Sequence, residues 1–178
     1  MDQLPGQRSL LCPGVQHRRG YSFYKDARLR RLTRYRYNSA PLDADGFHIY
    51  LRNPDGTLWN PGWQPTQTPL DHYRCRHGLG YTILEGEKDR IAARQELLVP
   101  PGDNCLLLRL TVTNRGDTDR SITLFPYLEF CLWDAVDDST NFQRNFSTGE
   151  VEVTPQAIYH KTEYRERRDH YAVFWADT

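Results

Sequence analysis

The sequence predicts an all-β protein, an antiparallel β-sandwich, and three observations support this fold class. Runs rich in β-branched and aromatic residues recur between Gly, Pro, Asn and Asp residues. In residues 106–113, Leu108, Leu110 and Val112 alternate with an arginine and two threonines, which is typical of a strand with one buried and one solvated face. Helical patterns are scarce, because even residues 25–37 lack a continuous apolar stripe. Strands are therefore expected along the whole chain.

The expected strands are bounded by turn-forming residues. In chain order they are residues 47–52, 80–84, 91–99, 105–114, 121–133, 157–162 and 171–175. The stretch 25–37 is rich in Tyr and Thr and is expected to be strand and loop. Three prolines in residues 60–69 oppose regular structure, so this segment is expected to be an ordered loop that carries Trp63.

One connection predicts how two of these strands pair. Residues 114–119 are short and polar and contain a glycine, which is typical of a hairpin between strands 105–114 and 121–133. Pro126 lies within the second strand and has no amide hydrogen to donate. It therefore predicts a sheet edge or a bulge at that point.

Composition excludes several function classes. The chain has 178 residues and a mass of 20.9 kDa, with 23 basic and 23 acidic side chains. Balanced charge provides no general attraction for nucleic acid or for an anionic membrane, so neither is expected as a partner. No apolar run approaches the roughly 20 residues that span a bilayer, and the N-terminus lacks the order of a secretory signal. The expected compartment is the cytoplasm.

The cysteines do not predict a metal site. Cys12, Cys75, Cys105 and Cys131 are too widely spaced for a structural zinc knuckle and are expected to be reduced and mostly buried. Two histidines at positions 72 and 77 lie near Cys75, but no second pair of ligands accompanies them. We expect no metal and no cofactor.

The richest chemistry lies in residues 141–153 and 159–168, where aromatic rings, amides and guanidinium groups are dense. Such mixtures suit a polyhydroxylated ligand, because rings cover its C–H faces and planar groups pair with vicinal hydroxyls. Core packing remains the better explanation for any single ring. An ion-pair ladder with neighbouring carboxylates is the better explanation for the cluster Arg165, Arg167 and Arg168.

Carboxylates are too abundant for one of them to be selected as a proton donor. A general acid needs a pocket that raises its pKa, which a sequence does not show. The motifs of serine hydrolases, phosphate-binding loops and zinc proteases are absent. The candidate carboxylates are Asp134, Asp137, Asp138, Glu150, Glu152, Glu163 and Glu166.

From residue 20 onward, the chain resembles the N-terminal part of cellobiose phosphorylases, in the inverting disaccharide phosphorylase family (glycoside hydrolase family 94, formerly glycosyltransferase family 36). The blocks that carry the resemblance begin at Gly20 (Gly-Tyr-Ser-Phe-Tyr-Lys-Asp-Ala-Arg), Arg31 (Arg-Leu-Thr-Arg-Tyr-Arg-Tyr-Asn), Trp63, Arg76, Val99, Glu129, Asn141 and His160 (His-Lys-Thr-Glu-Tyr-Arg-Glu-Arg-Arg). The Arg31 and His160 blocks resemble cellobiose phosphorylase more than the chitobiose enzyme of the same family.

The resemblance implies a galactose-mutarotase-like supersandwich that precedes a helical barrel carrying the general acid; the barrel lies outside this chain. It also implies a homodimeric enzyme, a hexosyltransferase, that converts cellobiose and inorganic phosphate to α-glucose 1-phosphate and glucose with inversion and without a cofactor. By the same resemblance, Tyr24 and Arg144 would hold the acceptor glucose. This fragment alone would be inactive.

The resemblance also divides the chain. Residues 20–178 are expected to be an incomplete, truncated N-terminal sandwich domain. Residues 1–19 differ from the sequence of the family. A permitted choice of codons for residues 5–19, read in a shifted frame, encodes the sequence that the family has at this place. We therefore expect a frame-shifted, non-native segment there. Two other interpretations stay open. One is a free-standing carbohydrate-binding module, for which the aromatic and arginine content would suffice; the other is a sandwich that serves only in dimer contact, which fits the homodimers that the resemblance implies.

Overall fold

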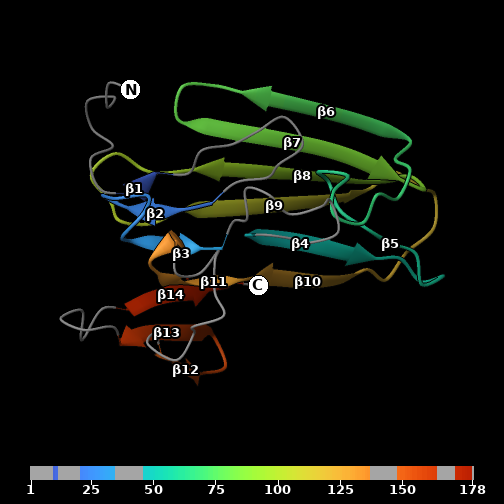
Figure 1. Cartoon of the computed structure of the whole chain (residues 1–178). Coiled ribbons are helices and arrows are strands. Elements are labelled where there is room, and N and C mark those ends of the chain that lie inside the picture. The colour runs from blue at the N-terminus through green and yellow to red at the C-terminus, as the bar shows by residue number, and fades with distance from the viewer. Residues whose placement is uncertain (1–9, 12–20, 35–45, 137–147, 164–170, 178) are drawn as a thin grey trace.

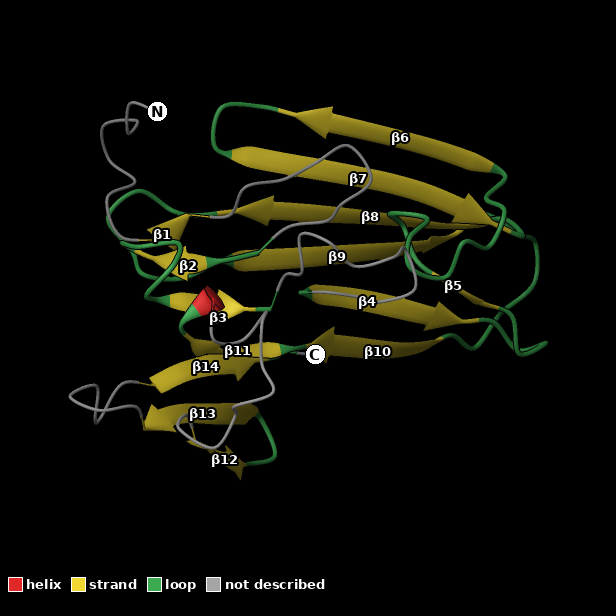
Figure 2. Ribbon diagram, viewed as in Figure 1, coloured by secondary structure: helices red, strands yellow, loops and turns green. Residues whose placement is uncertain are grey.

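The computed structural model describes residues 10–11, 21–34, 46–136, 148–163 and 171–177. These residues form an all-β structure of antiparallel sheets, which confirms the predicted fold class (Figures 1 and 2). The strands are β1 (Leu10–Leu11), β2 (Phe23–Tyr24), β3 (Arg31–Thr33), β4 (Phe47–Arg52), β5 (Leu58–Trp59), β6 (His72–His77), β7 (Tyr81–Lys88), β8 (Ile91–Leu98), β9 (Leu107–Asn114), β10 (Thr123–Leu128), β11 (Phe130–Trp133), β12 (Thr148–Val153), β13 (Ala157–Glu163) and β14 (Tyr171–Trp175).

Two of the sheets enclose the core. One has the strand order β6-β7-β8-β9 and the other the order β10-β4-β5. A cluster of buried side chains joins them, with Leu51 of β4 and Trp59 of β5 packed against Ile91 and Ala93 of β8. Burial of these apolar side chains is what holds the two sheets face to face.

The remaining strands form two further sheets, β1-β2-β3-β11 and β12-β13-β14. The ring of Phe130 on β11 stacks on the imidazole of His160 on β13, with 4.6 Å between ring centroids and 7° between ring planes. In Figure 1 the β12–β14 sheet lies beside β11, at the end of the molecule furthest from β6. Strand β11 therefore packs against the face of the β12–β14 sheet that carries His160.

Strand β8 shows how the sequence sets the register. Its alternate residues Ile91, Ala93, Gln95 and Leu97 are buried, as expected for a strand with one face on the core. Asp89 and Arg90 join β7 to β8 with φ values of 51° and 63°. Two consecutive left-handed residues are typical of the tight turn that matches the twist of a hairpin.

The predicted hairpin between β9 and β10 is wrong. Strand β9 pairs with β8, and β10 pairs with β4, with Pro126 opposite Ile49. The link between them crosses from one sheet to the other, and Leu110 and Ile122 on its two sides both pack against the core cluster. Burial of apolar surface in the sandwich thus outweighs the local turn signal. Strand β10 is an edge strand, as Pro126 predicted.

The other strand predictions are confirmed with changed bounds. The expected strand 121–133 is divided at Glu129 into β10 and β11, which belong to different sheets. Strand β7 extends beyond the predicted residues 80–84 to Lys88, and β1, β2, β5, β6 and β12 were not among the predicted strands. No helix among the described residues is long and apolar enough to cross a membrane.

Residues 60–69 form an ordered loop, as predicted. The side-chain amide of Asn60 donates a hydrogen bond to the Gln64 carbonyl, and the hydroxyl of Thr66 donates to Asn60 Oδ1 at 2.9 Å. The loop also contains a cis peptide bond before Pro65, and Trp63 has a φ of 66°. Asn60 is therefore the centre that ties this loop together.

The segment expected to be frame-shifted lies outside the described residues except for Leu10 and Leu11. These two residues form β1, with Leu10 paired to Tyr24 and Leu11 to Phe23. The frame shift itself stays a prediction.

Candidate functional site

Tyr24 is the predicted site residue that the structure describes. It ends β2 and begins a tight turn, in which its amide donates to the Arg30 carbonyl at 2.9 Å and its carbonyl accepts from the Asp26 amide at 2.7 Å. Asp26 Oδ1 accepts hydrogen bonds from the amides of Arg28 and Leu29 at 2.8 and 2.7 Å. This network fixes the backbone on both sides of the Tyr24 side chain.

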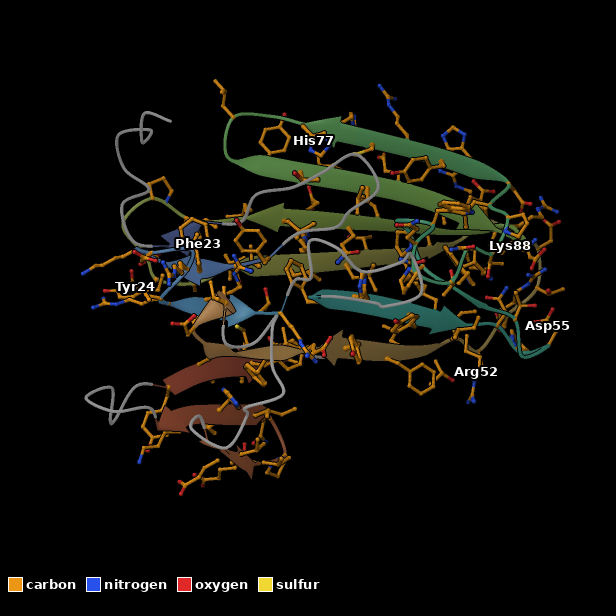
Figure 3. The ribbon with its side chains drawn as sticks, viewed as in Figure 1. Phe23, Tyr24, Arg52, Asp55, His77 and Lys88 are labelled. Carbon is orange, nitrogen blue, oxygen red and sulfur yellow. The ribbon has the colours of Figure 1, made fainter. Side chains whose placement is uncertain are left out.

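Cations surround the half-buried Tyr24 ring. Lys25 Nζ lies 4.9 Å and the Arg30 guanidinium carbon 5.8 Å from the ring centroid. Next to it, the guanidinium of Arg31 lies 4.0 Å from the centre of the Tyr21 ring. Figure 3 shows Phe23 and Tyr24 at the end of the molecule opposite Asp55 and Lys88. An aromatic ring flanked by donors can hold a hydroxylated ligand, because the ring covers C–H groups while the cations donate to oxygens.

The second predicted site residue, Arg144, falls in residues 137–147, outside the described part of the chain. The geometry between it and Tyr24 is therefore not part of the described structure. The arginine cluster at positions 165, 167 and 168 and the carboxylates Asp137, Asp138 and Glu166 also fall outside it.

Asp134, Glu150 and Glu152 are the carboxylate candidates whose side chains the structure describes. Asp134 Oδ1 accepts a hydrogen bond from the Val136 amide at 2.9 Å. Glu150 and Glu152 lie on β12 and are exposed to solvent. Glu150 and Glu152 therefore lack the apolar enclosure that a general acid needs.

A depression lies on the face of the β12–β14 sheet that points away from β11. Its volume is about 380 Å³, and Glu150, Glu152, Tyr159, Lys161 and Tyr171 line it together with Val151. Strands β12 and β13 come from the segments 141–153 and 159–168 that the sequence singles out, whereas the contribution of β14 was not predicted. The alternation of Tyr171, Val173 and Trp175 was the signal that could have identified it.

His160 lies on the opposite face of the same sheet. It is 5% exposed, and among the residues that the structure describes its Nδ1 atom has no hydrogen-bond partner. Burial lowers the pKa of the His160 imidazole below its ordinary value. The stacked contact with Phe130 is thus made by a neutral imidazole in the folded protein.

Acid is therefore expected to weaken the contact between β11 and β13. In the unfolded chain His160 takes up a proton near its ordinary pKa of about 6.5, whereas the folded protein resists protonation, so stability falls as pH decreases below about 6.5. Urea unfolding across this range measures the effect. The variant His160→Gln does not titrate and should lose less stability on acidification than the wild type; an equal loss in both proteins would contradict this prediction.

The cysteines of the described segments form no disulfide. Cys131 is buried and Cys75 is half-buried, but Cys105 is exposed, contrary to the expectation of mostly buried thiols. Cys75 Sγ lies 3.2 Å from His77 Nε2, and His77 Nδ1 lies 3.0 Å from the Thr82 hydroxyl. Burial raises the pKa of the Cys75 thiol, which disfavours a reactive thiolate.

His72 does not join the Cys75–His77 pair. Side chains at odd and even positions of β6 point to opposite faces of the strand. Among the described residues, no three His, Cys, Asp or Glu side chains form a group that could hold a metal ion.

The chain is similar to known proteins both as a match to a family model and in alignments with individual relatives. The family model described as glycosyl hydrolase 94, supersandwich domain, matches residues 16–178. N,N'-diacetylchitobiose phosphorylases from Vibrio proteolyticus and Vibrio furnissii are each 32% identical, over 86% and 85% of this chain and 20% of each relative. A solabiose phosphorylase from Paenibacillus borealis is 41% identical over 48% of this chain and 11% of its own length.

These matches define the limits of the similarity. The chain spans about a fifth of the length of the Vibrio relatives. The matches support a resemblance to disaccharide phosphorylases in general and not to the cellobiose enzyme in particular. The predicted resemblance therefore holds at the level of the family.

Proposed function

The chain belongs to the glycosyl hydrolase 94 family as its supersandwich domain, and we propose that it is the N-terminal carbohydrate-binding sandwich of a disaccharide phosphorylase. The match of the family model over residues 16–178 is the observation that carries this proposal. The relatives named above are disaccharide phosphorylases, and the cationic setting of the Tyr24 ring suits a hydroxylated ligand.

The proposed reaction is phosphorolysis with inversion. A phosphate oxygen attacks the anomeric carbon of the non-reducing glucose, and the glycosidic C–O bond breaks on the opposite face. The departing oxygen takes a proton from a general acid outside this chain and leaves as the acceptor sugar. Phosphate thus replaces water as the nucleophile, and the products are α-glucose 1-phosphate and a monosaccharide.

In this proposal, Tyr24 and Arg144 hold the acceptor sugar. The Tyr24 ring stacks on the C–H face of the sugar, and the Arg144 guanidinium donates paired hydrogen bonds to its hydroxyls. Cellobiose is the proposed disaccharide, because the blocks that begin at Arg31 and His160 resemble the cellobiose enzymes. A homodimer is the proposed assembly.

Acceptor kinetics test this assignment in the full-length protein that carries the domain. With α-glucose 1-phosphate as donor and glucose as acceptor, Arg144→Ala is expected to raise the KM for glucose roughly tenfold to a hundredfold, the loss of a charged hydrogen bond worth about 1.5–3 kcal/mol. The KM for α-glucose 1-phosphate should change little. Tyr24→Ala should act in the same direction, and Tyr24→Phe, which keeps the ring, should act less.

Arg109→Ala is the matched control. Arg109 is an exposed arginine on β9, in a different sheet from Tyr24, and its removal should leave both KM values unchanged. An unchanged KM for glucose in Arg144→Ala would remove that residue from the acceptor site.

A further inference from the structure

The outer face of the β12–β14 sheet carries a group of aromatic and charged side chains that is not part of the Tyr24 site. His160 and Ala172 point to the other face, where His160 stacks on β11, and both are buried. On the outer face, the side chains of Tyr171 and Trp175 are 55% and 61% accessible. Tyr24 belongs to a different sheet, in which β3 lies between β2 and β11. The two surfaces are thus separate in the fold.

Strand register places the side chains of this face in rows. Glu150 lies opposite Lys161, which lies opposite Tyr171; Glu152 lies opposite Tyr159, which lies opposite Val173. Neighbouring strands are about 4.8 Å apart, and residues two apart along a strand are separated by about 6.6 Å. These rows, called the tile below, are therefore about 10 Å wide, the scale of a short oligosaccharide. Trp175 extends this tile along β14, opposite Ala157.

The chemistry of the tile favours a neutral, hydroxylated ligand. Exposed rings of Tyr159 and Tyr171 offer flat apolar surfaces, while Glu150 and Glu152 accept hydrogen bonds and Lys161 donates them. Two carboxylates against one ammonium oppose an anionic ligand or an anionic membrane. The same charges at the centre of the face oppose a protein interface, whose core is usually depleted of charge. A depression of about 380 Å³ is within the range of small-molecule sites.

We propose that the outer face of the β12–β14 sheet is a second carbohydrate-binding surface, which holds a neutral oligosaccharide of β-linked glucose away from the Tyr24 site. Pyranose rings with equatorial hydroxyls present C–H groups on both faces, which stack on Tyr159 and Tyr171, and hydroxyls at the rim, which reach the carboxylates. This surface acts by binding alone and does not depend on the proposed catalytic function.

Titration of the isotope-labelled chain with cellotetraose, followed by amide NMR shifts, tests the proposal. Weak binding with a Kd in the range of about 1–10 mM is expected, because the surface is open to solvent. The shifts should centre on β12, β13 and β14. Tyr171→Ala is expected to weaken binding at least fivefold, and Tyr171→Phe, which keeps the ring, should retain most of it.

Tyr81→Ala is the matched control. Tyr81 is 49% exposed on β7, in a different sheet, so its removal should leave the affinity unchanged. Three results would overturn the proposal: no shifts at about 10 mM cellotetraose, shifts that centre on β2, or equal affinity in Tyr171→Ala and the wild type. Self-association that Tyr171→Ala abolishes and cellotetraose does not affect would instead identify an interface between copies.

Discussion

Replacing Trp59 by alanine is expected to cost about 3–5 kcal/mol of folding free energy, which is much of the stability of a typical domain. Trp59 of β5 is 0% exposed and belongs to the buried cluster that joins the sheet β10-β4-β5 to the sheet β6-β7-β8-β9. Its removal leaves a cavity that neighbouring strands cannot fill without losing their register.

The Trp59 side chain also has a polar role. Its Nε1 atom donates a hydrogen bond to Asn53 Oδ1 at 2.9 Å, and Asn53 Nδ2 in turn donates to Asp89 Oδ2 at 3.2 Å. The buried Asn53 therefore connects the end of β4 to the turn between β7 and β8. Loss of the indole would leave Asn53 Oδ1 without this donor, which adds a desolvation cost of about 1–3 kcal/mol if water does not enter.

Urea unfolding at neutral pH measures this effect. Trp59→Phe keeps most of the ring but not the N–H group and should lie between the wild type and Trp59→Ala. Trp175→Ala is the control, because that indole is 61% exposed. If Trp59→Ala were no more destabilising than Trp175→Ala, the core would not lie between these sheets.

Replacing Gly86 by alanine is the other large expected effect, about 1–3 kcal/mol, and it arises from crowding rather than from a cavity. A Cβ atom at Gly86 of β7 would lie 2.9 Å from Pro61 Cα and 3.0 Å from the Pro61 carbonyl oxygen. Both contacts are with backbone, so no flexible side chain can move aside. The loop that Asn60 holds together would have to shift.

Gly116→Ala is the control for this substitution. A Cβ at Gly116 would meet only side-chain atoms of Asn114 and Arg120, the nearest at 3.1 Å. These side chains can rearrange, so the free energy of unfolding should change by less than about 1 kcal/mol. Equal destabilisation by the two substitutions would show that loop 60–69 does not pack on β7.

Local patterns predicted the strands better than their partners. The alternation in residues 106–113 identified β9, whose Leu110 packs against the core cluster. The glycine-containing link 114–119 then suggested the wrong pairing, since β10 is paired with β4, a strand far earlier in the chain. Pairing of distant strands depends on which apolar faces are buried together. The sequence around Leu110 and Ile122 does not show that both side chains pack against the same core cluster.

Parts of the candidate site could likewise be predicted from the sequence, whereas other parts depend on how the strands pair. Tyr24 came from the family resemblance, and the structure adds Lys25 and Arg30 as neighbours of its ring. The tile on the outer face needs β12, β13 and β14 in register, with Glu150, Lys161 and Tyr171 in one row. These three residues come from three separate strands, so this surface could not be predicted before the strands were paired.

Phosphate-dependent cleavage of disaccharides by the full-length protein that carries this domain tests the central claim most directly. Cellobiose, N,N'-diacetylchitobiose and solabiose are each incubated with inorganic phosphate, and the release of sugar 1-phosphate is measured together with its anomeric configuration. The proposed function predicts release of α-glucose 1-phosphate, fastest from cellobiose and absent without phosphate. Hydrolysis without any sugar phosphate, or no cleavage of any of the three sugars, would contradict it.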